Sequence, residues 1–289
     1  MKILVTGGGG QLASALFDAA RATDHDLRML SLDELDITDA AAVRRILDRE
    51  RPAAVVNAAA YTAVDRAEEE EELATRINGD SVGGLASACV ESGARIVQVS
   101  TDFVFDGAAS RPIGPAETPR PLSAYGRSKL VGEERCREHG GDSWLIVRTA
   151  WLYGSGHQNF VSTMLRLMRD RTEIGVVADQ IGTPTWTGTL ASGILRLIDR
   201  GASGIHHLTD SGVATWYDFA VAIQEVGRGL GLLPRACVVR PISTSEYPTP
   251  AIRPCYSVLD KAKTFEILDG PTPHWRSGLV RCLEGWVEP

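Results

Sequence analysis

The chain of 289 residues is 44% hydrophobic and 23% charged, and it is long enough for one large or two unequal globular units. A formal net charge of −7 without a basic cluster argues against a nucleic-acid partner, and no apolar run approaches the ~18 residues of a membrane span. The five cysteines are far apart and form no CxxC pair, which argues against a disulfide framework and against a zinc site. Met1-Lys2 leads straight into a strand with no room for a signal peptide, so we expect a cytoplasmic protein.

The N-terminal segment has the pattern of a strand, a glycine turn and a helix. Lys2–Thr6 is apolar and β-branched, four glycines follow, and Gln11–Phe17 is helical in character. In the spacing Gly7-x-x-Gly10-x-x-Ala13, the first glycine permits a tight turn and the second lets the backbone approach a pyrophosphate. Backbone N–H groups and the positive end of a helix hold phosphates, so the segment predicts a dinucleotide-binding loop.

Two more strands and one helix follow. Asp26–Leu32 is the second predicted strand, and Thr38 or Asp39 is placed to cap a helix through Ala40–Arg49. Ala53–Asn57 is a third, buried strand. It opens onto three alanines and Tyr61-Thr62, and small residues at the end of a strand leave room for a flat cofactor.

The next part of the chain repeats the alternation. The acidic run Glu68–Glu72 predicts a solvated start of a helix, where negative charge suits the helix dipole. Asn78–Cys89 continues helically, and Arg95–Val99 forms a strand that ends in Ser100-Thr101-Asp102. Several prolines then mark a loop before another helix, and Trp144–Arg148 is a further strand.

This cadence predicts an α/β fold with a doubly wound parallel sheet of the Rossmann type and right-handed crossovers. Ligands of such sheets bind at the carboxyl ends of the strands. The glycine loop, Ala58–Thr62, Thr101 and the segment after Arg148 all fall on that edge, so we expect the functional site there.

The helix after the proline loop carries Tyr125-Gly-Arg-Ser-Lys129. A phenol and an ammonium four residues apart lie on one face of a helix, one turn from each other. An isolated phenol has a pKa near ~10, too high for easy proton transfer at neutral pH, and a nearby cation favours the phenolate. We therefore expect Lys129 to lower the pKa of Tyr125 and make its hydroxyl a usable acid or base.

Beyond Trp151 the alternation loosens. We expect a helix over Asn159–Arg169, a strand at Ile174–Val177, a helix over Thr187–Asp199 and a strand at Gly204–Leu208 that joins the sheet. The six histidines form no HExxH motif, which indicates structural or solvent-facing roles and no metal site. The predicted dinucleotide-binding domain comprises residues 1–152 with a return segment at about 182–210. The predicted smaller substrate-binding lobe comprises residues 153–181 and 211–289.

Several motifs resemble those of the dTDP-4-dehydrorhamnose reductases, within the extended short-chain dehydrogenase/reductase superfamily. The tyrosine–lysine and glycine motifs are shared by the whole superfamily, and the combination of the others is more specific. The similar stretches run nearly end to end: Ile3–Leu12, Asn57–Ala67, Ser100–Gly107, Pro121–Glu133, Arg148–Gly154, Asp179–Trp186 and Arg253–Asp260.

The resemblance implies hydride transfer from NADPH or NADH to C4 of a dTDP-4-keto-6-deoxy sugar. It assigns proton donation to Tyr125, lowering of the phenol pKa and binding of the nicotinamide ribose to Lys129, and orientation of the phenol or the carbonyl to Thr101. The implied dinucleotide contacts, besides Tyr125 and Lys129, are Gly7, Gly10, Gln11, Leu12, Asp36, Ile37, Ala59 and Ala60. The implied sugar contacts are Thr62, Val64, Asp102, Phe103 and Trp151.

The chain departs from the family pattern at a few positions. Ala13 replaces a frequent glycine, Phe103 stands where the family usually has tyrosine, and Cys255-Tyr256 replaces a small residue and an asparagine. The sugar therefore stays open, and a 4-ketoreductase for another dTDP-deoxysugar, such as an antibiotic sugar, would look similar. The choice between NADH and NADPH also stays open, as does the oligomeric state, for which a homodimer is one possibility.

Two other functions fit parts of the pattern. A sugar-nucleotide dehydratase of the same superfamily needs an Asp-Glu pair after the active-site threonine, and Phe103 occupies the second position here. A non-catalytic dinucleotide-binding regulatory subunit keeps the fold, but the intact Thr101, Tyr125 and Lys129 argue against it.

Overall fold

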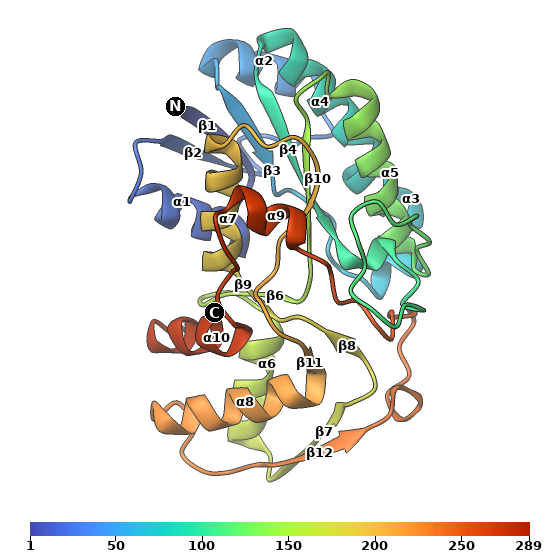
Figure 1. Cartoon of the computed structure of the whole chain (residues 1–289), viewed down its shortest axis with the longest axis vertical. Coiled ribbons are helices and arrows are strands. Elements are labelled where there is room, and N and C mark those ends of the chain that lie inside the picture. The colour runs from blue at the N-terminus through green and yellow to red at the C-terminus, as the bar shows by residue number, and fades with distance from the viewer.

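The computed structural model describes all residues, 1–289, and is built around one six-stranded sheet (Figure 1). Every neighbouring pair of strands in this sheet is parallel, which confirms the predicted doubly wound architecture. The strand order reverses at β1, which lies between β2 and β3, and ligands of such folds bind where the order reverses. In spatial order the strands are β10 (Gly204–His207), β5 (Leu145–Thr149), β4 (Arg95–Thr101), β3 (Ala54–Asn57), β1 (Lys2–Gly8) and β2 (Asp26–Ser31).

Helices cover both faces of the sheet because successive residues of a strand point to opposite sides. Ile3 and Val5 pack in one apolar cluster with α1 (Gln11–Ala20) and α7 (Thr187–Asp199). Leu4 points the other way, into a second cluster. The helices that contribute to this second cluster are α2 (Ala40–Glu50), α4 (Ser81–Ser92) and α5 (Ala124–His139).

Most predicted elements are present, with ends that shift by up to three residues. Of the two candidate caps of α2, Asp39 is the one used: its side chain accepts hydrogen bonds of 2.9 Å from the backbone N–H groups of Ala41 and Ala42. Helix α7 has the predicted bounds, and β10 joins the sheet as predicted, where it pairs with β5.

The acidic run meets the expectation of a solvated helix start only in its last two residues, Glu71 and Glu72, which are exposed in the first turn of a helix. It is divided between a 3₁₀ turn (Arg66–Glu68) and the short helix α3 (Glu71–Thr75), which leads into a π-helical turn (Arg76–Asp80). Two of its side chains hold the start of α5. Glu68 accepts a hydrogen bond of 2.9 Å from the backbone N–H of Ala124, and Glu71 pairs with Arg127 at 2.7 Å.

The smaller lobe lies beyond the carboxyl ends of the strands and has its own apolar cluster (Figure 1). No helix of the chain is both long and apolar enough to cross a membrane. The helices of the lobe are α6 (Phe160–Asp170), α8 (Trp216–Gly229) and α10 (Trp275–Glu284). Its strands pair as β7 (Glu173–Val177) with β12 (Val238–Ile242), β8 (Ile181–Gly182) with β11 (Ala214–Thr215), and β6 (Leu152–Tyr153) with β9 (Thr185–Trp186).

The division into two domains at the residues given above stays a prediction. One short segment of the predicted lobe packs against the sheet: α9 (Ala262–Ile267) contacts β10, and Leu268 belongs to the apolar cluster of α1 and α7. The chain therefore enters the sheet layer three times, with β1 through β5, with α7 and β10, and with α9.

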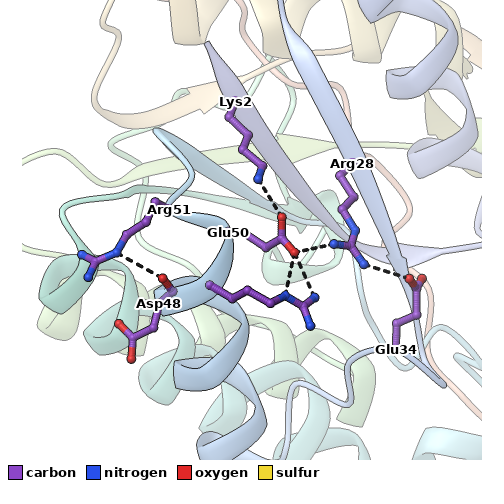
Figure 2. A network of polar contacts seen from close by, with 7 residues as sticks. Lys2, Arg28, Glu34, Asp48, Glu50 and Arg51 are labelled. Carbon is purple, nitrogen blue, oxygen red and sulfur yellow. Dashed lines mark hydrogen bonds and ion pairs between the residues drawn. The ribbon is translucent and has the colours of Figure 1, made fainter.

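An ion-pair network at the edge of the sheet joins β1 and β2 to the end of α2 (Figure 2). The carboxylate of Glu50 accepts hydrogen bonds from Lys2 at 2.6 Å, from Arg49 at 2.9 Å and from Arg28. The hydrogen bond from Lys2, followed by those of the arginines, lowers the pKa of Glu50 to about 2. The network lies far from the carboxyl ends of the strands, so its role is in stability.

Candidate active site

A cleft of about 630 Å³ lies between the carboxyl ends of the sheet strands and the smaller lobe, and it is lined from both sides. Sequence reasoning placed sixteen residues in the site, and all but two of them line this cleft. The two exceptions are Asp36 and Ile37, after β2: Asp36 accepts hydrogen bonds from Thr38, and Ile37 is buried in the core beneath α2. Their assignment to the dinucleotide stays a prediction. The fourteen residues that line the cleft are Gly7, Gly10, Gln11, Leu12, Ala59, Ala60, Thr62, Val64, Thr101, Asp102, Phe103, Tyr125, Lys129 and Trp151.

The glycine loop forms one wall of the cleft. Gly7 has a φ of +71°, and a Cβ at this position would lie 2.7 Å from the backbone nitrogen of Ala59, so a larger residue is excluded. Gly10 precedes α1 and provides no side-chain cap, which leaves the N–H groups of the first helical turn free to face the cleft. Such a helix end binds phosphates, so the loop fits the pyrophosphate of a dinucleotide.

Helix α5 brings Tyr125 and Lys129 to the cleft. Ser123 caps this helix by accepting a hydrogen bond of 3.1 Å from Gly126 N. A Cβ on Gly126 would lie 2.3 Å from the carbonyl oxygen of Phe103, so only glycine lets the helix approach the turn that follows β4. The ring of Tyr125 packs edge-on against Phe103, with 5.6 Å between the ring centroids.

Thr101 and Asp102 end β4 beside the phenol. The hydroxyl of Thr101 donates to Asp102 Oδ1 at 3.0 Å and accepts from the backbone N–H of Phe103 at 3.2 Å. The other carboxylate oxygen of Asp102 is buried and has no protein partner, although the residue lines the cleft. Burial raises the pKa of Asp102 to about 6, against the opposing effect of the nearby Ser257 and Thr101 hydroxyl groups. An unpartnered buried carboxylate oxygen is energetically costly, which marks Asp102 as a candidate functional residue.

The predicted net lowering of the Tyr125 pKa is wrong, because desolvation of the phenol outweighs the neighbouring ammonium. Desolvation by the surrounding protein raises the pKa of the Tyr125 phenol to about 12, in spite of the opposing effect of the nearby Thr101 hydroxyl, and the charge of Asp102 adds to the increase. Burial likewise lowers the pKa of Lys129 to about 8, and the charge of Glu133 opposes this decrease. The ammonium donates to the carbonyl oxygen of Val99 at 2.7 Å. At neutral pH the phenol therefore carries its proton, as a proton donor must.

A buried ion pair joins α5 to β5. Arg148 on β5 and Glu133 on α5 are both almost fully buried, and two guanidinium nitrogens donate to the carboxylate at 2.8 and 2.7 Å. Ser100 Oγ donates to the same carboxylate at 2.6 Å. Since Ser100 lies between Val99 and Thr101, this contact fixes the end of β4 against α5.

Two tryptophans form the lobe side of the cleft. The rings of Trp151 and Trp216 stack with centroids 3.5 Å apart and planes 4° from parallel. Trp216 Nε1 donates to the side-chain oxygen of Gln180 at 3.1 Å, which fixes the stack. Trp151 has a φ of +48°, which is rare for a bulky side chain and is found mainly at functional sites.

Several cleft residues were missed from the sequence: His157, Gln158, Trp216 and Arg253. Arg253 lies in one of the stretches that carry the family resemblance, and its place in that motif was the available signal. The other three lie in segments without a recognisable motif.

The arrangement combines a phosphate-binding loop, a protonated phenol, a buried ammonium and an aromatic wall in one cleft. It fits a nicotinamide dinucleotide, because the glycine cradle leaves no room for a side chain and the first turn of α1 offers free N–H groups. No group of three or more His, Cys, Asp or Glu side chains is close enough to hold a metal ion. The chemistry that these groups support is proton transfer to an oxygen next to a bound dinucleotide.

The chain is similar to known proteins over nearly its whole length. The model of the family described as RmlD substrate binding domain matches residues 1–287. The dTDP-4-dehydrorhamnose reductase of Burkholderia thailandensis is 41% identical over 98% of this chain and 98% of its own length. The dTDP-4-keto-6-deoxy-D-glucose reductase of Streptomyces niveus is 40% identical over 97% of this chain and 96% of its own length. The crystal structure of the dTDP-4-dehydrorhamnose reductase of Bacillus anthracis in complex with NADP has a TM-score of 0.92 at 35% identity, covering 98% of each chain.

Proposed function

The chain belongs to the RmlD substrate binding domain family, and we propose that it reduces the C4 ketone of a dTDP-4-keto-6-deoxyhexose with NADPH or NADH. The observation that carries this proposal is the meeting of Thr101, Tyr125 and Lys129 with the glycine loop in one cleft. The free cysteines, four of them buried, fit the reducing conditions of the cytoplasm, where we place the enzyme.

Different residues of the cleft bind the dinucleotide, donate the proton and stabilise the charge that results. The glycine loop and the adjoining Ala59-Ala60 hold the dinucleotide, which supplies the hydride when it is bound. Tyr125 donates its phenolic proton to the C4 oxygen as negative charge develops there, and its high pKa ensures that the proton is present at neutral pH. Lys129 then stabilises the resulting phenolate electrostatically.

The sugar side of the cleft supports the same reaction. The free oxygen of Asp102 is placed to accept a hydrogen bond from a sugar hydroxyl, and Thr101 holds this carboxylate in position. The stacked Trp151 and Trp216 offer a flat apolar surface, as sugar rings require. Closing these groups around the substrate excludes water from the proton transfer.

The direct test is to follow the absorbance of NADPH and NADH with a panel of dTDP-4-keto-6-deoxy sugars. We expect oxidation of the reduced cofactor with at least one sugar, in a 1:1 ratio to the alcohol product. Unchanged absorbance with every sugar, despite tight cofactor binding, would refute the reductase and favour a non-catalytic binding subunit.

The identity of the sugar is a separate question, raised by Phe103 in the cleft wall, where the family usually has tyrosine. The Streptomyces niveus relative is named for a different sugar from that of the other reductases, so 40% identity is compatible with either. We expect Phe103→Tyr to change the relative kcat/KM among the sugars and to leave the ratio for NADPH and NADH unchanged. The stereochemistry of each product at C4, determined by NMR, identifies the reaction.

A further inference from the structure

Arg253 has one hydrogen-bonding edge that the protein leaves free. Asp65, in the loop after β3, accepts hydrogen bonds from Nη1 at 3.1 Å and from Nη2 at 2.9 Å, so it takes the end of the guanidinium fork. Nη1 also donates to Thr249 Oγ1 and to the carbonyl oxygen of Ala251. Nε–H and the second hydrogen of Nη2 have no protein acceptor. These two hydrogens point in parallel along the side edge of the planar group, the geometry that binds two oxygens of one phosphate or carboxylate.

This edge belongs to a residue of the cleft wall. Arg253 lines the cleft, and its side chain is 25% exposed. Lys129 is the only other lysine or arginine that lines the cleft, and it is buried and donates to Val99. A guanidinium keeps its charge at any physiological pH. Arg253 is therefore the remaining permanent positive charge that faces the cleft.

The position of Arg253 indicates which ligand it meets. Its partner Asp65 follows Val64, on the part of the cleft wall assigned to the sugar substrate, whereas the phosphate-binding loop of the dinucleotide lies at the start of α1. Because Asp65 already holds the guanidinium in place, little side-chain freedom is lost when the free edge binds an anion.

We propose that the Nε and Nη2 edge of Arg253 binds a phosphate of the nucleoside diphosphate in the substrate. The inference rests on the proposed function, since it assumes a nucleotide-sugar substrate. The Asp65–Arg253 pair thus has two roles: it joins the loop after β3 to the C-terminal segment, and it presents a bidentate donor to the diphosphate.

The test compares binding of dTDP, thymidine and NADPH to the wild type and to three variants. Arg253→Ala should weaken dTDP about 10- to 100-fold, the loss expected for charged hydrogen bonds, and leave NADPH affinity unchanged. Thymidine, followed by ligand-observed NMR because it binds more weakly, should bind the wild type and Arg253→Ala equally. Arg253→Lys keeps the charge but not the planar edge, so most of the loss for dTDP should remain.

Asp65→Asn is the matched control for a purely structural ion pair. It retains one side-chain oxygen for the guanidinium and removes the competing negative charge, so dTDP should bind as tightly as in the wild type or more tightly. Unchanged dTDP affinity in Arg253→Ala, or equal losses for dTDP and thymidine, would overturn the assignment. A wild-type protein that binds NADPH but no dTDP would instead refute the proposed substrate class, so the two failures are distinguishable.

Discussion

The ammonium of Lys129 donates a hydrogen bond of 2.7 Å to the carbonyl oxygen of Val99, two residues before Thr101. The same carbonyl accepts a second hydrogen bond, of 2.9 Å, from Gln98 Nε2. The bond therefore joins the helix that carries Tyr125 to the strand that carries Thr101. The relative position of the two hydroxyl groups depends on this contact between helix and strand.

The first prediction concerns the pH dependence of turnover. Burial lowers the pKa of Lys129 to about 8, so the ammonium is present below this pH and is lost as the pH rises through it. Since the charge stabilises the phenolate left after proton donation, we expect kcat for reduction to fall above about pH 8. Lys129→Met should reduce kcat about 100-fold at neutral pH and remove this alkaline decrease. A pH–rate profile that is the same in the variant and the wild type would contradict the role.

The second prediction isolates proton donation. Tyr125→Phe should lower kcat by about 10²- to 10⁴-fold, the usual contribution of a general acid, while NADPH affinity stays near that of the wild type. Tyr247→Phe is the matched control, because this phenol lies in the lobe and its residue is 60% exposed. Comparable turnover in Tyr125→Phe and Tyr247→Phe would mean that another group supplies the proton.

The third prediction separates positioning from stability in the buried ion pair. Glu133→Gln removes a negative charge that raises the pKa of Lys129, so the alkaline decrease in kcat should move to lower pH. It also leaves Arg148 without its charged partner, which should cost up to about 3–5 kcal/mol of stability. Glu138→Gln changes an exposed ion pair on the same helix and should alter neither quantity. A lower Tm with an unmoved pH profile would restrict Glu133 to a structural role.

The fourth prediction tests the tryptophan wall. A Cβ on Gly182 would lie 2.5 Å from Cε2 of Trp151, so Gly182→Ala must displace the indole from its stack on Trp216. We expect KM for the sugar substrate to rise about 10-fold, which corresponds to a loss of about 1.4 kcal/mol in binding free energy. Gly84→Ala in α4 is the control, since its Cβ would meet no atom within 4 Å and should leave KM unchanged. Equal KM values in the two variants would exclude Trp151 from substrate binding.

The fifth prediction concerns stability at acid pH. The folded protein lowers the pKa of Glu50 to about 2, so the ion-pair network of Figure 2 contributes stability above the unfolded-state pKa of Glu50, and this stability is lost as the pH falls toward 2. Glu50→Gln should lower Tm at neutral pH by a few degrees, and the difference from the wild type should shrink as the pH falls below about 4.5. Thermal unfolding measured at several pH values checks this, and a Tm difference that is constant with pH would contradict it.

The sheet and the core of the site were predictable because both follow from local pattern and topology. Apolar strands alternating with helices specify a parallel sheet, and the carboxyl ends of parallel strands meet at one edge. Thr101 at the end of β4 and Tyr125 at the start of α5 had to come together for this reason. The family resemblance added further residues that line the cleft, including Trp151.

The remaining features depend on contacts between segments that are far apart in the sequence, and no local sequence pattern indicates such contacts. Arg253 reaches the cleft through a contact with Asp65, 188 residues earlier, and Trp216 reaches it by stacking on Trp151. The direction of the pKa shift of Tyr125 was wrong for a similar reason. Helical spacing gives the nearness of Lys129, but the desolvation that dominates the pKa comes from everything packed around the phenol.

The chain passes several times between the sheet and the smaller lobe, and this limits where the protein can be cut or recombined. Helix α7 and β10 belong to the sheet layer but follow the first lobe segment, and α9 returns there after α8 and β12. No single cut in the polypeptide separates the lobe from the sheet, so neither is obtained by truncation at one point. A chimera that exchanges sugar preference with a relative must therefore be spliced at several junctions, because grafting the C-terminal half alone would replace an edge strand and a covering helix as well.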